Sequence, residues 1–182
     1  MAITLRALAD SDLDSLFIWE SDPRAVQMAA FTRANPSDRS EFDAHYERVR
    51  NDPSATLLAI DDDAEFVGTV ASFTMEGERE VSYWIDPARW GQGLASRALR
   101  AFLAIEPTRP IYGRVAHHNA ASAKVLARAG FVEVGSETAF APGVGAEIVE
   151  RIYRLDNWMI DSQAAGPPEG DARLGQRSGM TP

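Results

Sequence analysis

The chain has 182 residues, 45% of them hydrophobic and 25% charged, which suffices for one globular domain with a substantial core. Its formal net charge of -9 argues against a broad nucleic-acid-binding surface. The acidic charge is compatible with a cationic or amine substrate, and simple solubility is the alternative explanation for it. The absence of cysteine excludes disulfides, thiolate metal ligands and cysteine nucleophiles. No stretch approaches the ~20 apolar residues of a membrane span and no signal-peptide pattern opens the chain, so we expect a cytoplasmic protein that binds no membrane.

The N-terminal part is predicted to contain a strand over residues 3–8 and two helices. The first helix begins at the N-cap oxygens of residues 10–12 and runs to about Trp19. The second runs from Asp38 to about Arg50, with apolar side chains at helical spacing. Residues 21–36 lack a regular pattern, so we expect an irregular segment there, of the kind that often borders an active site.

Three strands are predicted next, over residues 56–60, 65–73 and 80–86, and such a run favours an antiparallel sheet. The acidic run at residues 61–63 is interpreted as a solvated hairpin turn, because its carboxylates are not spaced like those of a calcium loop. The adjacent His117 and His118 would point to opposite faces of a strand. Neither group therefore predicts a metal site.

The most informative motif is the glycine turn Trp90-Gly91-Gln92-Gly93-Leu94-Ala95, which lies between a strand-like run and a helix-like run. The free backbone N–H groups and the dipole at the start of a helix make an anion site, which predicts a phosphate-bearing cofactor. Two glycines before a helix also serve simply to turn the chain tightly. The spacing fits neither the P-loop nor the dinucleotide fingerprint.

A strand over residues 111–117 and a helix over residues 119–128 are predicted to follow, and residues 131–140 and 147–155 form a last antiparallel pair. The strand–helix–strand unit predicts one parallel pair, whose carboxyl ends can open a crevice for a ligand. The predicted fold class is α/β (α+β), with a mixed, mostly antiparallel sheet of six to seven strands and about four helices. One domain is expected over residues 1–160, followed by a flexible tail over residues 161–182.

Three features, in this order, resemble the GCN5-related N-acetyltransferase (GNAT) family of acyl-CoA-dependent amine acetyltransferases. The first is the glycine turn, where Gly93 and Ala95 match two fixed positions and Trp90 departs from the family's Arg or Gln. The Trp-Gly pair resembles the branch of ribosomal-protein alanine N-acetyltransferases (RimJ/RimL-like). The second feature is Asn119-Ala120-Ala121-Ser122 followed by Val125-Leu126, and the third is Gly130-Phe131. The resemblance covers roughly residues 3–156 and implies a splayed parallel strand pair.

The resemblance implies acetyl-CoA as co-substrate, with its pyrophosphate on backbone N–H groups of the glycine turn. Its pantetheine arm would pair with an exposed strand edge, and the N–H near Ile85 would polarise the thioester carbonyl. Asn119 would hold a pantetheine amide, and it is also a good helix N-cap. The implied cofactor-binding residues are Trp84, Ile85, Asp86, Gln92, Gly93, Leu94, Ala95, Ser96, Asn119 and Ser122. Arg89 and Arg97 are candidates for additional positive charge.

The implied catalytic residues are Ser122, beside the sulfur as hydrogen-bond donor or acid, and Glu80 as base, directly or through water. Their alternatives are helix capping for Ser122 and a solvated strand end for Glu80; His117 or His118 is another candidate base. Tyr83 and the tryptophans are expected in the core or the crevice wall. The acceptor would be a protein N-terminus or a small amine, in a monomer or a homodimer. A non-catalytic acyl-CoA-binding sensor or interaction module shares the glycine turn and is the alternative function.

Overall fold

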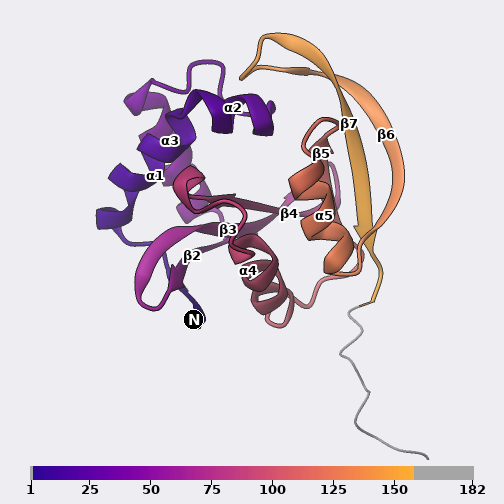
Figure 1. Ribbon diagram of the computed structural model, residues 1–182, viewed down its shortest axis with the longest axis horizontal. Helices are drawn as coiled ribbons and strands as arrows, with labels where there is room; N and C mark the ends of the chain where they lie inside the picture. Colours follow the sequence, from indigo (N-terminus) through magenta and orange to yellow (C-terminus); the bar gives the residue numbers. More distant parts are fainter. Residues whose placement is uncertain (1, 158–182) are drawn as a thin grey trace, which may run out of the picture.

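In the computed structural model, residues 2–157 are described, and they form one open seven-stranded sheet with helices on both faces (Figure 1). The strand order is β1-β2-β3-β4-β5-β7-β6. The strands are β1 (Ile3–Ala7), β2 (Thr56–Asp62), β3 (Glu65–Met75), β4 (Glu78–Ile85), β5 (Ile111–Ala116), β6 (Val132–Ala141) and β7 (Ala146–Leu155). The predicted mixed sheet is confirmed. The tail predicted over residues 161–182 lies outside the described residues.

Five α-helices accompany the sheet, one more than the sequence predicts. They are α1 (Leu13–Ser21), α2 (Pro23–Ala29), α3 (Arg39–Asn51), α4 (Leu94–Leu103) and α5 (Ala120–Arg128), with short 3-10 turns η1 (Asp10–Asp12) and η2 (Pro87–Arg89). The helix missed is α2, so the prediction of an irregular segment over residues 21–36 is wrong for its first half. Asp22 starts this helix by accepting the N–H of Arg24 at 2.8 Å, with Pro23 at its first position. Seven residues are too few to show a helical period. Within residues 2–157, no helix has the length and apolarity needed to cross a bilayer.

The acidic run after β2 is a second correction. The hairpin turn is there, but β2 continues through Asp62, and Asp61 and Asp62 are buried. Asp61 accepts a hydrogen bond from Arg6 at 2.8 Å, and Asp62 lies 3.3 Å from Arg97. Arg6 of β1 and Arg97 of α4 therefore neutralise two carboxylates that the local sequence predicts to be solvated.

The strands pair antiparallel throughout except for β4 and β5. This parallel pair is joined at only two register positions, Arg79 with Ile111 and Glu80 with Tyr112. Beyond them β4 continues to Ile85 beside β3, and β5 continues to Ala116 beside β7. The two strands therefore form a wedge, with a closed end at Arg79 and an open end toward Ile85, and the expected splay is confirmed.

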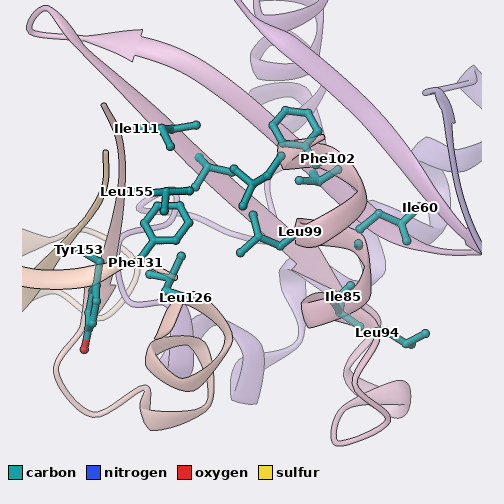
Figure 2. Packing of buried hydrophobic residues seen from close by; sticks show 14 of the residues in the cluster. Ile60, Ile85, Leu94, Leu99, Phe102, Ile111, Leu126, Phe131, Tyr153 and Leu155 are labelled. Atoms are coloured by element: carbon teal, nitrogen blue, oxygen red, sulfur yellow. The ribbon is translucent and has the colours of Figure 1, made fainter. Parts of the chain in front are cut away.

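The main core lies between the sheet and helices α4 and α5 (Figure 2). Leu94, Leu99 and Phe102 of α4 pack with Val81 and Ile85 of β4, and all are buried. Leu126 brings α5 onto β5 at Gly113, where a Cβ would lie 2.8 Å from both of its methyl carbons. The absence of a side chain at this position therefore lets α5 approach the sheet closely.

A second core cluster covers the opposite face of the sheet. It contains Leu16, Phe42 and Tyr46 from α1 and α3, with Trp84 of β4 packed against it. Because side chains alternate along a strand, Glu80 shares this face with Trp84, whereas Tyr83 shares the α4–α5 face with Ile85. The two faces of β4 thus contribute to different sides of the wedge.

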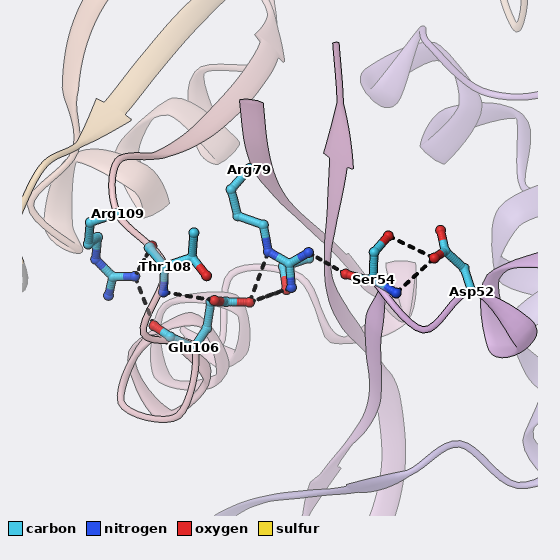
Figure 3. Close-up of polar contacts among 7 residues, drawn as sticks. Asp52, Ser54, Arg79, Glu106, Thr108 and Arg109 are labelled. Carbon is cyan, nitrogen blue, oxygen red and sulfur yellow. Dashed lines mark hydrogen bonds and ion pairs between the residues drawn. The ribbon is translucent and has the colours of Figure 1, made fainter. Parts of the chain in front are cut away.

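A buried polar network holds the closed end (Figure 3). Arg79 donates to Glu106 at 2.6 Å and to Ser72 at 2.7 Å, and it also bonds the backbone carbonyl of Ser54. Burial alone would raise the pKa of Glu106, but hydrogen bonds from Ser72, Arg79 and Thr108 outweigh it and lower this pKa to about 2. The carboxylate is therefore fully charged and compensated at neutral pH.

Candidate functional site

The open end of the wedge contains a cavity of about 350 Å³. Three segments line it: α2, the end of β4 with the glycine turn, and α5 with its N-cap Asn119. Tyr83 and Trp84, which point to opposite faces of β4, both line the cavity, so it reaches both faces of the sheet at the open end of the wedge. Among its lining residues are Ala25, Met28, Ala29, Tyr83, Trp84, Ile85, Arg89, Trp90, Gly93, Leu94, Ala95, Ser96, Asn119, Ser122, Lys124 and Arg128.

The glycine turn lines one end of this cavity, at the start of α4. Gly93 is the N-cap of α4 with a φ of 73°, in the left-handed region that favours glycine. The first intrahelical bond runs from the N–H of Arg97 to the carbonyl of Gly93 at 3.2 Å, so the preceding amides of the helix point outward. No acidic side chain occupies the first turn. The predicted anion site therefore has both donors and an uncompensated dipole.

Two of the predicted cofactor residues, Asp86 and Gln92, do not line the cavity. Asp86 instead caps η2, accepting the N–H of Ala88 at 2.9 Å, while its own N–H donates to Val67. Ile85 lines the cavity, and its carbonyl accepts the indole N–H of Trp90 at 3.0 Å. Trp90 therefore ties the glycine turn to the end of β4.

Positive charge on the cavity rim comes from both walls. Arg89 lines the wall of the glycine turn and is paired with Glu65, whereas Arg97 pairs with Asp62 away from the cavity. Lys124 and Arg128 line the α5 wall, and neither joins an ion pair within residues 2–157. Sequence reasoning missed these two, although their spacing of four residues places them on one helix face.

Asn119 connects α5 to α2. Its side-chain oxygen accepts the N–H of Ser122 at 3.0 Å, which confirms the N-cap interpretation, and its amide nitrogen donates to the carbonyl of Met28 at 3.2 Å. His118 bonds the neighbouring carbonyl of Gln27 at 2.8 Å. Two side chains from the β5–α5 turn therefore hold the C-terminal end of α2 over the cavity. Among residues 2–157, no three His, Asp or Glu side chains gather as metal ligands would.

Ser122 lies in the cavity wall with an unexpected partner. Its hydroxyl is 2.8 Å from the hydroxyl of Tyr83, which also lies 3.2 Å from the backbone carbonyl of Ser122. Burial raises the pKa of Tyr83 to about 12, although the bond to Ser122 acts in the opposite direction. Tyr83 was expected only as core or wall. Strand alternation could have placed it on the α5 face, but no local pattern identifies Ser122 as its partner.

Glu80 does not line this cavity. It lies on the opposite face at the last paired position of the wedge, is 6% exposed, and accepts a hydrogen bond from Arg114 of β5 at 3.0 Å. Arg114 also faces Glu78, Glu137 and Glu150. Burial raises the pKa of Glu80 above its ordinary value, although the Arg114 guanidinium acts to lower it. Ser122 and Glu80 are therefore on opposite sides of the sheet.

Comparison with protein families and solved structures gives a consistent result. The model of the acetyltransferase (GNAT) domain family matches residues 2–132. A search of curated proteins finds no significant match.

Solved structures with a similar fold include the following three acetyltransferases. Spermidine N-acetyltransferase from Vibrio cholerae, in complex with CoA and spermine, is 23% identical with a TM-score of 0.68, over 83% of this chain and 94% of that one. RimL, a ribosomal L7/L12 alpha-N-protein acetyltransferase in complex with coenzyme A, is 19% identical with a TM-score of 0.71, over 86% and 94%. AAC(6')-Ib, in complex with ribostamycin and coenzyme A, is 19% identical with a TM-score of 0.66, over 84% and 93%. At these identities the likeness establishes the fold.

Proposed function

The chain belongs to the GNAT family of acetyl-CoA-dependent acetyltransferases, and on that premise we propose that it transfers an acetyl group to a primary amine by direct attack. The observation that carries this proposal is the cavity at the open end of the β4–β5 wedge, which residues from both faces of β4 line. Such a cavity lets a thioester enter from the α4–α5 side while an amine approaches from the opposite face. The two reactants then meet between the strands without sharing an entrance.

The α4–α5 side supplies what acetyl-CoA requires. The outward amides around Gly93 suit the pyrophosphate, and Lys124 and Arg128 add positive charge on the facing wall. The proposed pantetheine contacts are the end of β4 and the wall at Ser122. The thioester carbonyl oxygen is an acceptor, so we assign it to the backbone N–H near Ile85 as the proposed oxyanion donor.

In the proposed reaction the amine nitrogen forms a bond to the thioester carbon, giving a tetrahedral intermediate, and the C–S bond then breaks. Ser122 donates a hydrogen bond to the departing sulfur. Glu80 accepts the amine proton through water from the opposite face. Because burial raises the pKa of Glu80 above that of an ordinary glutamate, the acid limb of kcat/KM is expected at a higher pH than an exposed glutamate base would give.

We propose a primary amine, either a protein N-terminus or a small molecule, as the acceptor. Solved structures of this fold hold spermine or ribostamycin, and another is a ribosomal-protein acetyltransferase, so both classes are included in the test. A cytoplasmic location and a homodimer remain predictions.

The experiment measures thiol release from acetyl-CoA with a panel of amines and peptides. The double variant Ser122→Ala with Glu80→Gln is expected to reduce turnover about 100-fold or more while the affinity for acetyl-CoA, which has no free thiol, stays within about twofold of the wild-type value. Glu47→Gln, on the exposed side of α3, is the matched control. Unchanged turnover in the double variant would contradict the assigned roles. Binding of acetyl-CoA without acetylation of any amine would favour the sensor instead.

A further inference from the structure

The hydroxyl groups of Tyr83 and Ser122 form one unit in the cavity wall. Tyr83 reaches from β4 and Ser122 from the first turn of α5, and their oxygens are 2.8 Å apart. The backbone of Ser122 is fixed by its N-cap bond to Asn119 and by its carbonyl contact with Tyr83. The two hydroxyl protons can still rotate, because neither of these bonds fixes their directions.

The proton on the short bond can belong to either oxygen, and the two arrangements differ in consequence. If Ser122 donates to Tyr83, its only proton is used within the protein, and the single phenol proton goes to the backbone carbonyl of Ser122 at 3.2 Å. If Tyr83 donates to Ser122, the serine oxygen is satisfied as an acceptor and its own proton can point into the cavity. Only the second arrangement gives the cavity a hydrogen-bond donor at this position.

We propose that Tyr83 is a positioning residue that donates to Ser122 and thereby directs the serine proton at the sulfur of bound CoA. This inference rests on the proposed function and assigns a role that the sequence does not indicate. Tyr83 remains protonated throughout, and no proton passes from it to the sulfur. Burial keeps the phenol neutral at working pH, so it serves as a donor in every cycle.

The direct test uses the thiol pKa of bound CoA, which needs no acceptor amine. We would measure CoA affinity against pH for wild-type protein, Tyr83→Phe and Ser122→Ala. A hydrogen bond to the thiolate favours that form, so both variants are expected to raise the bound thiol pKa by about one unit relative to wild type, a tenfold loss of preference for the thiolate. Arg89, Lys124 and Arg128 also line the cavity and favour the thiolate, but they are identical in all three proteins.

Desulfo-CoA, which lacks the sulfur, separates positioning from packing. All three proteins are expected to bind it within about twofold of one another. Tyr153→Phe is the matched control, because Tyr153 is buried on the same sheet face but bonds Glu133 and does not line the cavity. A loss of desulfo-CoA affinity in Tyr83→Phe equal to its loss of CoA affinity would overturn the proposal, because Tyr83 would then only shape the wall.

Kinetics add a second criterion with any amine that the wild-type enzyme acetylates. Tyr83→Phe is expected to lower kcat about tenfold with the KM for acetyl-CoA unchanged. In the Ser122→Ala background the same substitution should have no further effect, since the hydroxyl that it positions is gone. Losses that multiply in the double variant, or a bound thiol pKa unchanged in Tyr83→Phe, would overturn the proposal. Failure of wild-type protein to bind CoA would instead contradict the proposed function itself.

Discussion

The two ends of the β4–β5 wedge differ in how their hydrogen-bond donors are satisfied. At the closed end, Arg79 is surrounded by acceptors from three other segments, and its main partner, Glu106, is 5% exposed. At the open end, the outward amides around Gly93 and the buried indole N–H of Trp84 have no such acceptors among the described residues. One strand pair thus separates a compensated polar network from a set of donors available to a ligand.

This difference assigns stability mainly to the closed end of the wedge and ligand binding to the open end. A buried network with compensated charges stabilises the folded state, and breaking one member leaves an uncompensated charge. Unsatisfied donors at the other end weaken local structure until a ligand binds there. Variants at the closed end should therefore change unfolding with little effect on ligand affinity, and variants at the open end should do the reverse.

The largest effect is expected for Glu106→Gln at the closed end. It should lower the free energy of unfolding by about 3 kcal/mol, because Arg79 loses its buried counter-charge. Since the folded pKa of Glu106 is depressed to about 2, its contribution is present above about pH 4.5 and is lost as pH falls toward 2. Denaturant unfolding between pH 7 and pH 2 measures both. Asp43→Asn, at a half-exposed pair on α3, is the control, and an equal loss there would contradict the account.

Gly143→Ala should cost about 2 kcal/mol and disturb the acceptor side of the open end. A Cβ there would lie 2.1 Å from the Thr32 hydroxyl and 2.8 Å from the Ala30 carbonyl, so the β6–β7 turn must move away from the end of α2. We expect the KM for the amine to rise with CoA affinity unchanged. Gly135→Ala in the same hairpin meets nothing within 4 Å and is the control. Equal kinetic effects of the two would show that the turn does not shape the acceptor side.

Gly93→Ala should weaken CoA binding about tenfold. A Cβ at Gly93 meets nothing within 4 Å, so the substitution causes no clash. The cost comes from the left-handed φ of 73°, about 1–2 kcal/mol for a residue with a Cβ. The turn must keep this conformation when CoA is bound, so the cost appears as lost affinity. Gly77→Ala in the β3–β4 turn is the matched control, with a φ of 86° and equally open surroundings. Calorimetry with CoA should separate the two variants. Identical affinities would argue against phosphate binding by this turn.

Asn119→Ala is expected to have the smallest effect, about 1 kcal/mol of stability, from loss of the α5 N-cap. Asn119→Asp keeps the capping oxygen but loses the amide that donates to Met28. Thermal unfolding should therefore show Asn119→Asp near wild type. A similar loss in both variants would mean that the contact with α2, rather than the cap, carries the stability.

Local signals explain what the sequence could predict. The glycine turn, the N-cap at Asn119 and the alternating strands are each encoded within about ten neighbouring residues. The compensation of Asp61 by Arg6 and the pairing of Tyr83 with Ser122 are not, because each joins segments 39 or 55 residues apart. Glu80 illustrates both cases. Its position on a strand follows from the local pattern, whereas its burial beside Arg114 depends on β5, which lies across the wedge.

The central claim is that CoA occupies the open end of the wedge and leaves the closed end untouched. Amide hydrogen exchange with and without CoA tests it most directly. We predict slower exchange at residues 84–86 and 91–96 on adding CoA, with no change at residues 72–79 and 106–110. Protection that falls at the closed end, or none at the glycine turn at saturating CoA, would contradict the account.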